Sequence, residues 1–88
     1  MAMSMEDLKP KTQKGMQTRN RLLRSAEYVF GKRGYHESSI VEITQHAEIS
    51  LGSFYTYFES KYHIFEALLR EMIKELTRVL KEKTADID

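Results

Sequence analysis

The 88-residue chain contains no cysteine and no tryptophan, and only one proline and four glycines. Without cysteine it can form neither a disulfide nor a thiolate metal site. The histidines, His36, His46 and His63, do not share a ligand spacing such as i, i+4 on one helix, so we expect no metal and no cofactor. No apolar run approaches the roughly 20 residues that cross a membrane, and the first residues lack the apolar segment of a signal peptide. These absences predict one small cytoplasmic domain without a membrane partner.

Charge is nearly balanced overall, with a formal net charge of +1, but its distribution is uneven. Residues 8–36 carry many Lys and Arg side chains and a single acid, Glu27, whereas residues 37–58 carry acids and no Lys or Arg. A basic segment of this kind usually lies in solvent, but it can also attract the phosphates of a nucleic acid. The flexible basic arm that we predict at residues 1–16 is a candidate for such attraction.

The first helix is predicted to start after Thr18, a candidate N-cap, and to end at Gly34, a candidate C-cap. Between them, apolar residues recur on one helical face: Leu22, Leu23, Ala26, Val29 and Phe30. Lys32 and Arg33 would favour the negative end of this helix. A short loop then leads to the next element.

Residues 39–58, SIVEITQHAEISLGSFYTYF, predict two short helices joined by a tight turn. Ser39 is the N-cap candidate of the first, with Glu42 placed to complete a capping box. Ser50 is the N-cap candidate of the second. The second helix has an apolar face at i, i+3, i+4 and i+7, formed by Leu51, Phe54, Tyr55 and Phe58. This is the layout of a helix-turn-helix, whose second helix enters the major groove of DNA, but an ordinary hairpin of amphipathic helices has the same pattern.

The second of these helices also has a face suited to DNA. The candidate base contacts are Leu51, Gly52, Ser53 and Thr56. A leucine side chain can touch thymine methyl groups, glycine lets the backbone approach closely, and the two hydroxyls can bond base edges. Tyr57 lies on the same side, and its hydroxyl and that of Tyr55 can reach phosphate oxygens. Phe54 and Phe58 lie on the opposite side and are the predicted core residues of this helix.

The last helix is predicted over residues 60–82, with Ser60 as its N-cap candidate and a frayed tail at residues 83–88. Its apolar face continues beyond the length that a three-helix unit can cover. The uncovered residues are Met72, Ile73, Val79 and Leu80. The expected fold is therefore all-α, with a three-helix helix-turn-helix bundle in residues 17–59 followed by a long fourth helix.

The run from Thr18 to about Leu69 resembles the N-terminal DNA-binding domain of TetR-family (tetracycline-repressor-type) transcription regulators. The matching pieces, in order, are TRNRLLRSAEYVFGKRGYHESSI, VEITQHAEIS and LGSFYTYFESK. They correspond to the first helix of the family, its second helix, and a recognition helix that ends in aromatic residues before a Ser-Lys pair. Each piece is weak alone, whereas the ordered set with this spacing is specific.

The resemblance implies a role for each matching position. Base contacts are implied for Leu51, Gly52, Ser53 and Thr56. Phosphate contacts are implied for Ser39, Tyr55, Tyr57 and Lys61. The resemblance further implies a repressor that binds a palindromic operator on double-stranded DNA as a homodimer and leaves it when a small-molecule inducer binds a C-terminal domain. That domain would follow residue 82, so we expect either an excised DNA-binding domain or an unusually short protein.

Three positions depart from the pattern of the family. Glu48 stands where glycine is frequent, and a positive φ there would cost roughly 1 kcal/mol. Leu51 stands where a basic residue is frequent, which argues against a strong phosphate or guanine contact at this position. His63 stands where an acid often completes the capping box of the last helix.

A helical protein-interaction module that uses the exposed face of the last helix is the alternative to a DNA-binding module. Salt distinguishes the two, because DNA binding weakens steeply with salt. An enzyme is not expected, and no catalytic residue is predicted, because no nucleophile, base or metal motif has the spacing that catalysis needs.

Overall fold

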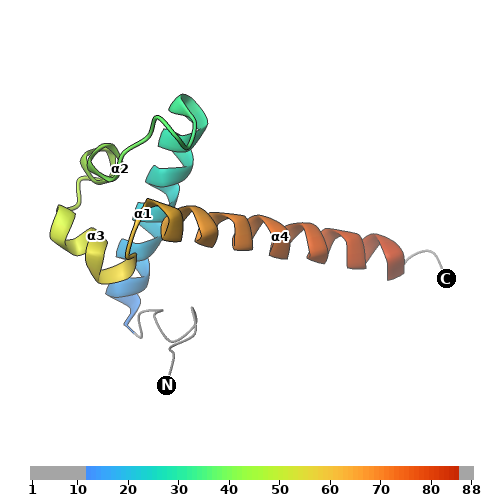
Figure 1. The fold of residues 1–88 in the computed structure, drawn as a ribbon. Helices are drawn as coiled ribbons and strands as arrows, with labels where there is room; N and C mark the ends of the chain where they lie inside the picture. Colours follow the sequence, from blue (N-terminus) through green and yellow to red (C-terminus); the bar gives the residue numbers. More distant parts are fainter. Residues whose placement is uncertain (1–11, 86–88) are drawn as a thin grey trace, which may run out of the picture.

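The computed structural model describes residues 12–85, which form four α-helices and no strand (Figure 1). The helices are α1 (Gln13–Arg33), α2 (Ile40–Ala47), α3 (Leu51–Tyr57) and α4 (Lys61–Ala85). The predicted all-α fold with a long fourth helix is confirmed. Residues 1–11 and 86–88, which include most of the predicted arm and the end of the predicted tail, lie outside the described residues. The division into domains stays a prediction.

The first helix, α1, begins earlier than predicted. Thr12 rather than Thr18 is its N-cap, because the Thr12 hydroxyl accepts a hydrogen bond from the N–H of Gly15 at 3.1 Å. Thr18 lies inside the helix, where its hydroxyl donates to the carbonyl of Lys14 at 3.1 Å. The prediction was wrong because a threonine hydroxyl can serve as a cap or bond the carbonyl one turn back. Residues 13–16 are therefore helical and not part of a flexible arm.

The other helix ends follow the predicted caps. The hydroxyls of Ser39, Ser50 and Ser60 accept the N–H three residues later at 3.1, 3.1 and 3.2 Å. At the end of α1, Gly34 has a φ of 82°, which glycine adopts without strain. Because α2 and α3 each begin at a serine with this local chemistry, their starting points are set by the sequence itself.

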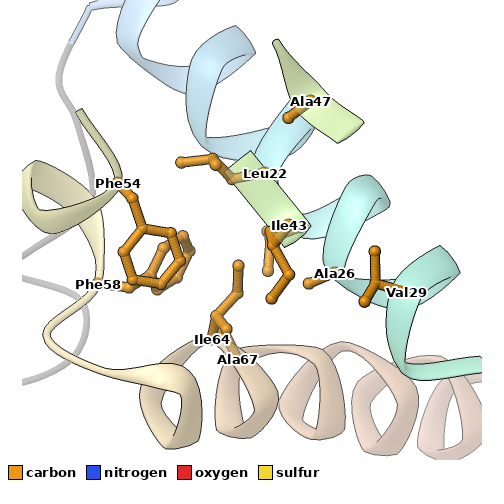
Figure 2. Close-up of a cluster of buried hydrophobic side chains, with 10 residues drawn as sticks. Leu22, Ala26, Val29, Ile43, Ala47, Phe54, Phe58, Ile64 and Ala67 are labelled. Atoms are coloured by element: carbon orange, nitrogen blue, oxygen red, sulfur yellow. The ribbon is translucent and has the colours of Figure 1, made fainter. Parts of the chain in front are cut away.

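One apolar core joins the four helices, as the close-up in Figure 2 shows. Its fully buried large side chains are Leu22, Leu23, Ile43, Phe54 and Ile64. Phe54 and Phe58 project from α3 into the space that Leu22 and Ile64 also occupy (Figure 2). The predicted core role of both phenylalanines is confirmed. Burial of two aromatic side chains anchors α3, which is too short to be stable alone.

The second half of α4 leaves the other three helices (Figure 1). Four of its apolar side chains there are exposed, namely Met72, Ile73, Leu76 and Leu80, whereas Val79, which was expected to be uncovered, is half-buried. The helix continues to Ala85, beyond the predicted end at residue 82, and Arg78 pairs with Glu75 and Glu82 near this end. Such pairs at i, i+3 and i, i+4 support a solvated helix. In the part of the chain that is described, no helix has the length and apolarity to cross a membrane.

Candidate nucleic-acid interface

A strained turn sets the angle between α2 and α3. Glu48 ends α2 with φ 58° and ψ 43°, the left-handed conformation, and is the one non-glycine residue of the described chain with positive φ. Its N–H donates to the carbonyl of Gln45 at 3.2 Å, and the N–H of Ile49 donates to that of Thr44 at 3.0 Å. These bonds close the helix end and hold Glu48 in a conformation that costs a side chain about 1 to 2 kcal/mol. Glu48, which stands where the family frequently has glycine, thus does have a positive φ.

The predicted base-contact residues of α3 differ in how accessible they are. Leu51 is 46% exposed, Gly52 and Thr56 are exposed, and Ser53 is half-buried. The Thr56 hydroxyl donates to the carbonyl of Gly52 at 3.3 Å, and the Ser53 hydroxyl accepts from that of Ser50 at 2.9 Å. Thr56 therefore keeps lone pairs that can accept, and Ser53 keeps a proton that it can donate. Contact of this surface with DNA stays a prediction.

The two tyrosines of α3 differ in exposure. Tyr55 is 52% exposed, and its ring packs edge-on against Phe54 with centroids 5.3 Å apart. Tyr57 is half-buried and packs against the core, although the sequence placed it opposite Phe54 and Phe58. The placement was wrong because Tyr57 is three residues after Phe54, and residues at this spacing share a helical face. Tyr55 is thus the more accessible of the two candidate phosphate contacts.

Ser39 lies at the start of α2, where it is half-buried and acts as the N-cap. Its hydroxyl accepts the N–H of Glu42 and lies 3.3 Å from Oε1 of the same residue, to which it donates. A capping box would instead have the carboxylate accept the N–H of Ser39. The difference has a local cause, because Arg33 of α1 holds the same carboxylate at 2.6 Å. Next to this cap, Val41 is 49% exposed and is an accessible apolar side chain that the sequence did not single out.

Lys61, at the start of α4, has its ammonium group against the protein itself. Nζ donates to the carbonyls of Tyr35, His36 and Ser38 at 2.8, 3.3 and 2.9 Å. An ammonium has three N–H groups, so these bonds use all of them. Nζ also lies 4.4 Å from the centroid of the Tyr35 ring. The side chain is therefore not free for the phosphate contact that the resemblance implies.

A polar network that the sequence did not predict joins α1 to α2. The buried hydroxyl of Ser25 donates to the carbonyl of Ile43 at 2.7 Å, so that it accepts from Nδ1 of His46 at 2.9 Å. Arg21 donates to the carbonyl of Ala47 at 2.5 Å, at the end of α2. These contacts fix α2 on α1 and satisfy polar groups that would be costly to bury alone. Backbone acceptors leave no pattern in a sequence, which is why spacing could not reveal them.

Positive charge close to α3 comes from α1 and not from α3 itself. Arg19 places its guanidinium carbon 5.2 Å from the centroid of the Phe58 ring. Burial lowers the pKa of Arg19, while the nearby Glu71 partly offsets this effect, and the side chain stays charged at neutral pH. Glu48 and Glu59 flank α3, which has no charged residue of its own. Attraction for phosphates must therefore come from outside α2 and α3.

The chemistry available on α3 is recognition by contact. Among residues 12–85, no group of three His, Asp or Glu side chains is placed to hold a metal ion. A small apolar side chain, a glycine and two hydroxyls can read methyl groups and hydrogen-bonding edges in a groove. Phe54 and Phe58 anchor α3 in the core, and such readout needs a surface that is held in place.

Comparison with known proteins gives the same family as the sequence resemblance. The family described as "Bacterial regulatory proteins, tetR family" matches residues 22–68, from the middle of α1 into α4. No solved structure shows a significant match.

Several curated relatives are named as transcription regulators. The HTH-type regulator YdgC of Bacillus subtilis (strain 168) is 39% identical over 70 residues, which cover 76% of this chain and 36% of that protein. The repressor DhaR of Mycobacterium sp. (strain GP1) is 37% identical over 68 residues, with coverage of 77% and 34%. The repressor BepR of Brucella suis biovar 1 (strain 1330) is 38% identical over 53 residues, with coverage of 60% and 25%. The chain thus spans about a third or less of the length of these relatives. It belongs to the tetR family of bacterial regulatory proteins, which are transcription regulators and not enzymes, and it carries their DNA-binding helix-turn-helix domain.

Proposed function

We propose that the chain reads a specific DNA sequence through α3 and is part of a repressor. The observation that carries this proposal is the accessible, uncharged face of α3, which Phe54 and Phe58 anchor in the core. The proposed base contacts are Leu51, Gly52, Ser53 and Thr56. Two of the relatives named above are themselves called repressors, which supports repression as the role of this protein.

The proposed phosphate contacts lie beside this face. The hydroxyls of Ser39, Tyr55 and Tyr57 are the candidates, since hydroxyl groups commonly bond phosphate oxygens and fix the register of a protein on DNA. Tyr55 contributes most, because it is the more exposed of the two tyrosines. The ammonium of Lys61 is left out of this set because the loop before α2 occupies it.

Pairing of two chains on a palindromic operator is the second part of the proposal. One recognition helix contacts only a few base pairs, and two copies on successive half-sites gain affinity together. The matched relatives are about three times as long as the matched region, which leaves room for a domain that pairs the chains and binds a small-molecule inducer. Release would follow when this domain moves α4. A location in the cytoplasm stays a prediction.

A fluorescence titration against duplex DNA tests the proposal. The duplex is one selected from a random library, and a scrambled duplex of the same composition is the control, each at about 50 and 200 mM salt. We expect tighter binding to the selected duplex and a steep loss of affinity with salt for both. Equal affinity for the two duplexes at both salt concentrations would refute sequence-specific readout.

A protein-interaction module is the second candidate, because α4 exposes Met72, Ile73 and Leu76. Such a module would bind neither duplex at either salt concentration. The same titration therefore separates the two candidates.

A further inference from the structure

Lys61 joins α4 to the loop between α1 and α2. This loop, residues 34–39, ends at Ser39, the N-cap of α2. All three bonds of the Lys61 ammonium end on carbonyl oxygens of this loop, and two of them are shorter than 3.0 Å. No carboxylate takes part, so this is not an ordinary surface ion pair but a cation bound by backbone dipoles.

Aromatic packing supports the same junction. Phe65 lies one helical turn after Lys61 on the same side of α4. Its ring lies 4.7 Å from that of Tyr35 and 5.6 Å from that of Phe30, measured between centroids. The Tyr35 ring thus meets the Lys61 ammonium and the Phe65 ring, and α4 holds the loop by a charge and by an apolar contact.

The loop is closed by its own hydrogen bonds immediately before α2. The buried Ser38 donates its hydroxyl to the carbonyl of Gly34 at 2.6 Å and its N–H to that of Tyr35 at 3.2 Å. Its own carbonyl accepts from Lys61. Because a peptide unit is planar, fixing this carbonyl also fixes the N–H and the Cα of Ser39, the residue from which α2 begins.

We propose that Lys61 is a positioning residue, which we call the loop clamp, that sets the orientation of the helix-turn-helix relative to α4. The helix α4 packs more against α1 than against α2 or α3. The hydrogen bonds of the loop clamp are therefore important as the polar link from α4 to the residues just before α2. A movement of the first turn of α4 is transmitted through the clamp to α2 and, across the Glu48 turn, to α3. This inference rests on the proposed function only where DNA recognition is measured.

Two substitutions separate a clamp from a phosphate contact. Lys61→Met keeps an unbranched side chain only one atom shorter and removes its charge and donors. Lys61→Arg keeps the charge and suits a phosphate well, but its planar fork cannot place three N–H groups on converging carbonyls as an ammonium does. Lys74→Met is the matched control, because Lys74 is an exposed lysine of the same helix.

Hydrogen exchange of the free 88-residue chain is the first measurement. We expect the amide of Ser38 and its neighbours in residues 35–39 to exchange about tenfold faster or more in both Lys61 variants and unchanged in Lys74→Met. Loss of the fold in both Lys61 variants would also support the clamp, because a phosphate contact does not stabilise the free protein. Unchanged exchange in residues 35–39 would overturn the proposal, whatever the result with DNA.

DNA binding is the second measurement. We expect both Lys61 variants to lose affinity for the selected duplex about fivefold or more beyond their loss for the scrambled duplex, because orientation governs base readout. A phosphate contact predicts equal losses on both duplexes, a salt slope lower by about one in Lys61→Met, and full binding by Lys61→Arg. That second pattern would overturn the clamp. If the unmodified chain bound no DNA, the proposed function would fail, and hydrogen exchange alone would decide on the clamp.

Discussion

At the scale of single residues, Glu48 limits stability through one backbone angle. Its φ of 58° is required by the turn, and no other non-glycine residue in residues 12–85 has a positive φ. A side chain in this conformation costs about 1 to 2 kcal/mol of folding stability. Glycine would remove this strain, but its greater flexibility in the unfolded chain would offset part of the gain.

Glu48→Gly should therefore stabilise the domain by about 0.5 to 1 kcal/mol, which raises Tm by about 2 to 8 °C for a chain of this size. Thermal unfolding followed by circular dichroism measures the shift. Glu48→Ala is the control, since it removes the same charge and keeps the Cβ that causes the strain. Equal stabilisation by both variants would mean that charge, and not conformation, is the cause.

Thr56 is the residue on which base selection is tested most cleanly. It is exposed, and its hydroxyl bonds only the Gly52 carbonyl one turn back, so its removal should leave stability unchanged. We expect Thr56→Ala to weaken binding to the selected duplex by about 1 to 3 kcal/mol and binding to the scrambled duplex hardly at all. Thr56→Ser, which keeps the hydroxyl, should behave like the unmodified chain. Parallel losses on both duplexes would assign Thr56 to the DNA backbone.

At the scale of elements, α3 is the shortest helix and α4 the longest, and different interactions stabilise them. α3 depends on two buried aromatics, whereas the second half of α4 is solvated and exposes apolar side chains. An exposed apolar face of this kind favours association.

Replacing Met72, Ile73 and Leu80 with glutamine should leave the fold and its Tm nearly unchanged and abolish any self-association at high concentration. Sedimentation and thermal unfolding are the measurements. Ile64→Ala, a change at a buried position of the same helix, is the contrasting variant and should cost about 2 to 5 kcal/mol. If the unmodified chain forms a tight dimer at micromolar concentration, α4 is a dimer interface in its own right and needs no further domain for pairing.

The sequence predicted the features that depend on residues close together in the chain. The caps at Ser39, Ser50 and Gly34 were predictable because a cap is a local hydrogen bond or a local φ. The start of α1 was not predictable, because Thr12 and Thr18 are both suitable N-cap residues. Only the structure shows that the hydroxyl of Thr12 accepts a free N–H and that of Thr18 does not. The hydrogen bonds of Lys61 were missed for a different reason, since its partners are backbone carbonyls that any residue could supply.

At the scale of the whole molecule, we expect electrostatic attraction and base recognition to come from different regions. Residues 37–60 contain no Lys or Arg, and Lys61 is occupied, so phosphates must be neutralised elsewhere. Arg19 packs on Phe58, which places the first half of α1 beside the end of α3. Lys14 belongs to this half of α1, and we expect it and the lysines that precede it in the sequence, Lys9 and Lys11, to attract the DNA backbone.

Substituting Lys9 and Lys11 with glutamine should lower the slope of log affinity against log salt by up to about two, at equal cost to selected and scrambled DNA. Lys81 and Lys83, exposed near the far end of α4, form the control pair with the same loss of charge. Titrations at several salt concentrations give the slopes. Equal slopes for the two double variants would show that net charge, and not contact near α3, is what attracts DNA.

The length of α4 has a mechanical consequence. From Lys61 to Ala85 the helix extends about 36 Å at 1.5 Å per residue, and it is held at one end by the core and free of the other helices at the far end. In the proposed release mechanism such a helix acts as a lever that rotates about its first turns. A displacement of about 5 Å at Ala85 requires a rotation of only about 8° at the fulcrum. Hydrogen bonds to base edges tolerate misplacement of about 0.5 Å, so under this mechanism a coarse movement at the tip would become a small rotation near the helix-turn-helix that is enough to change DNA binding.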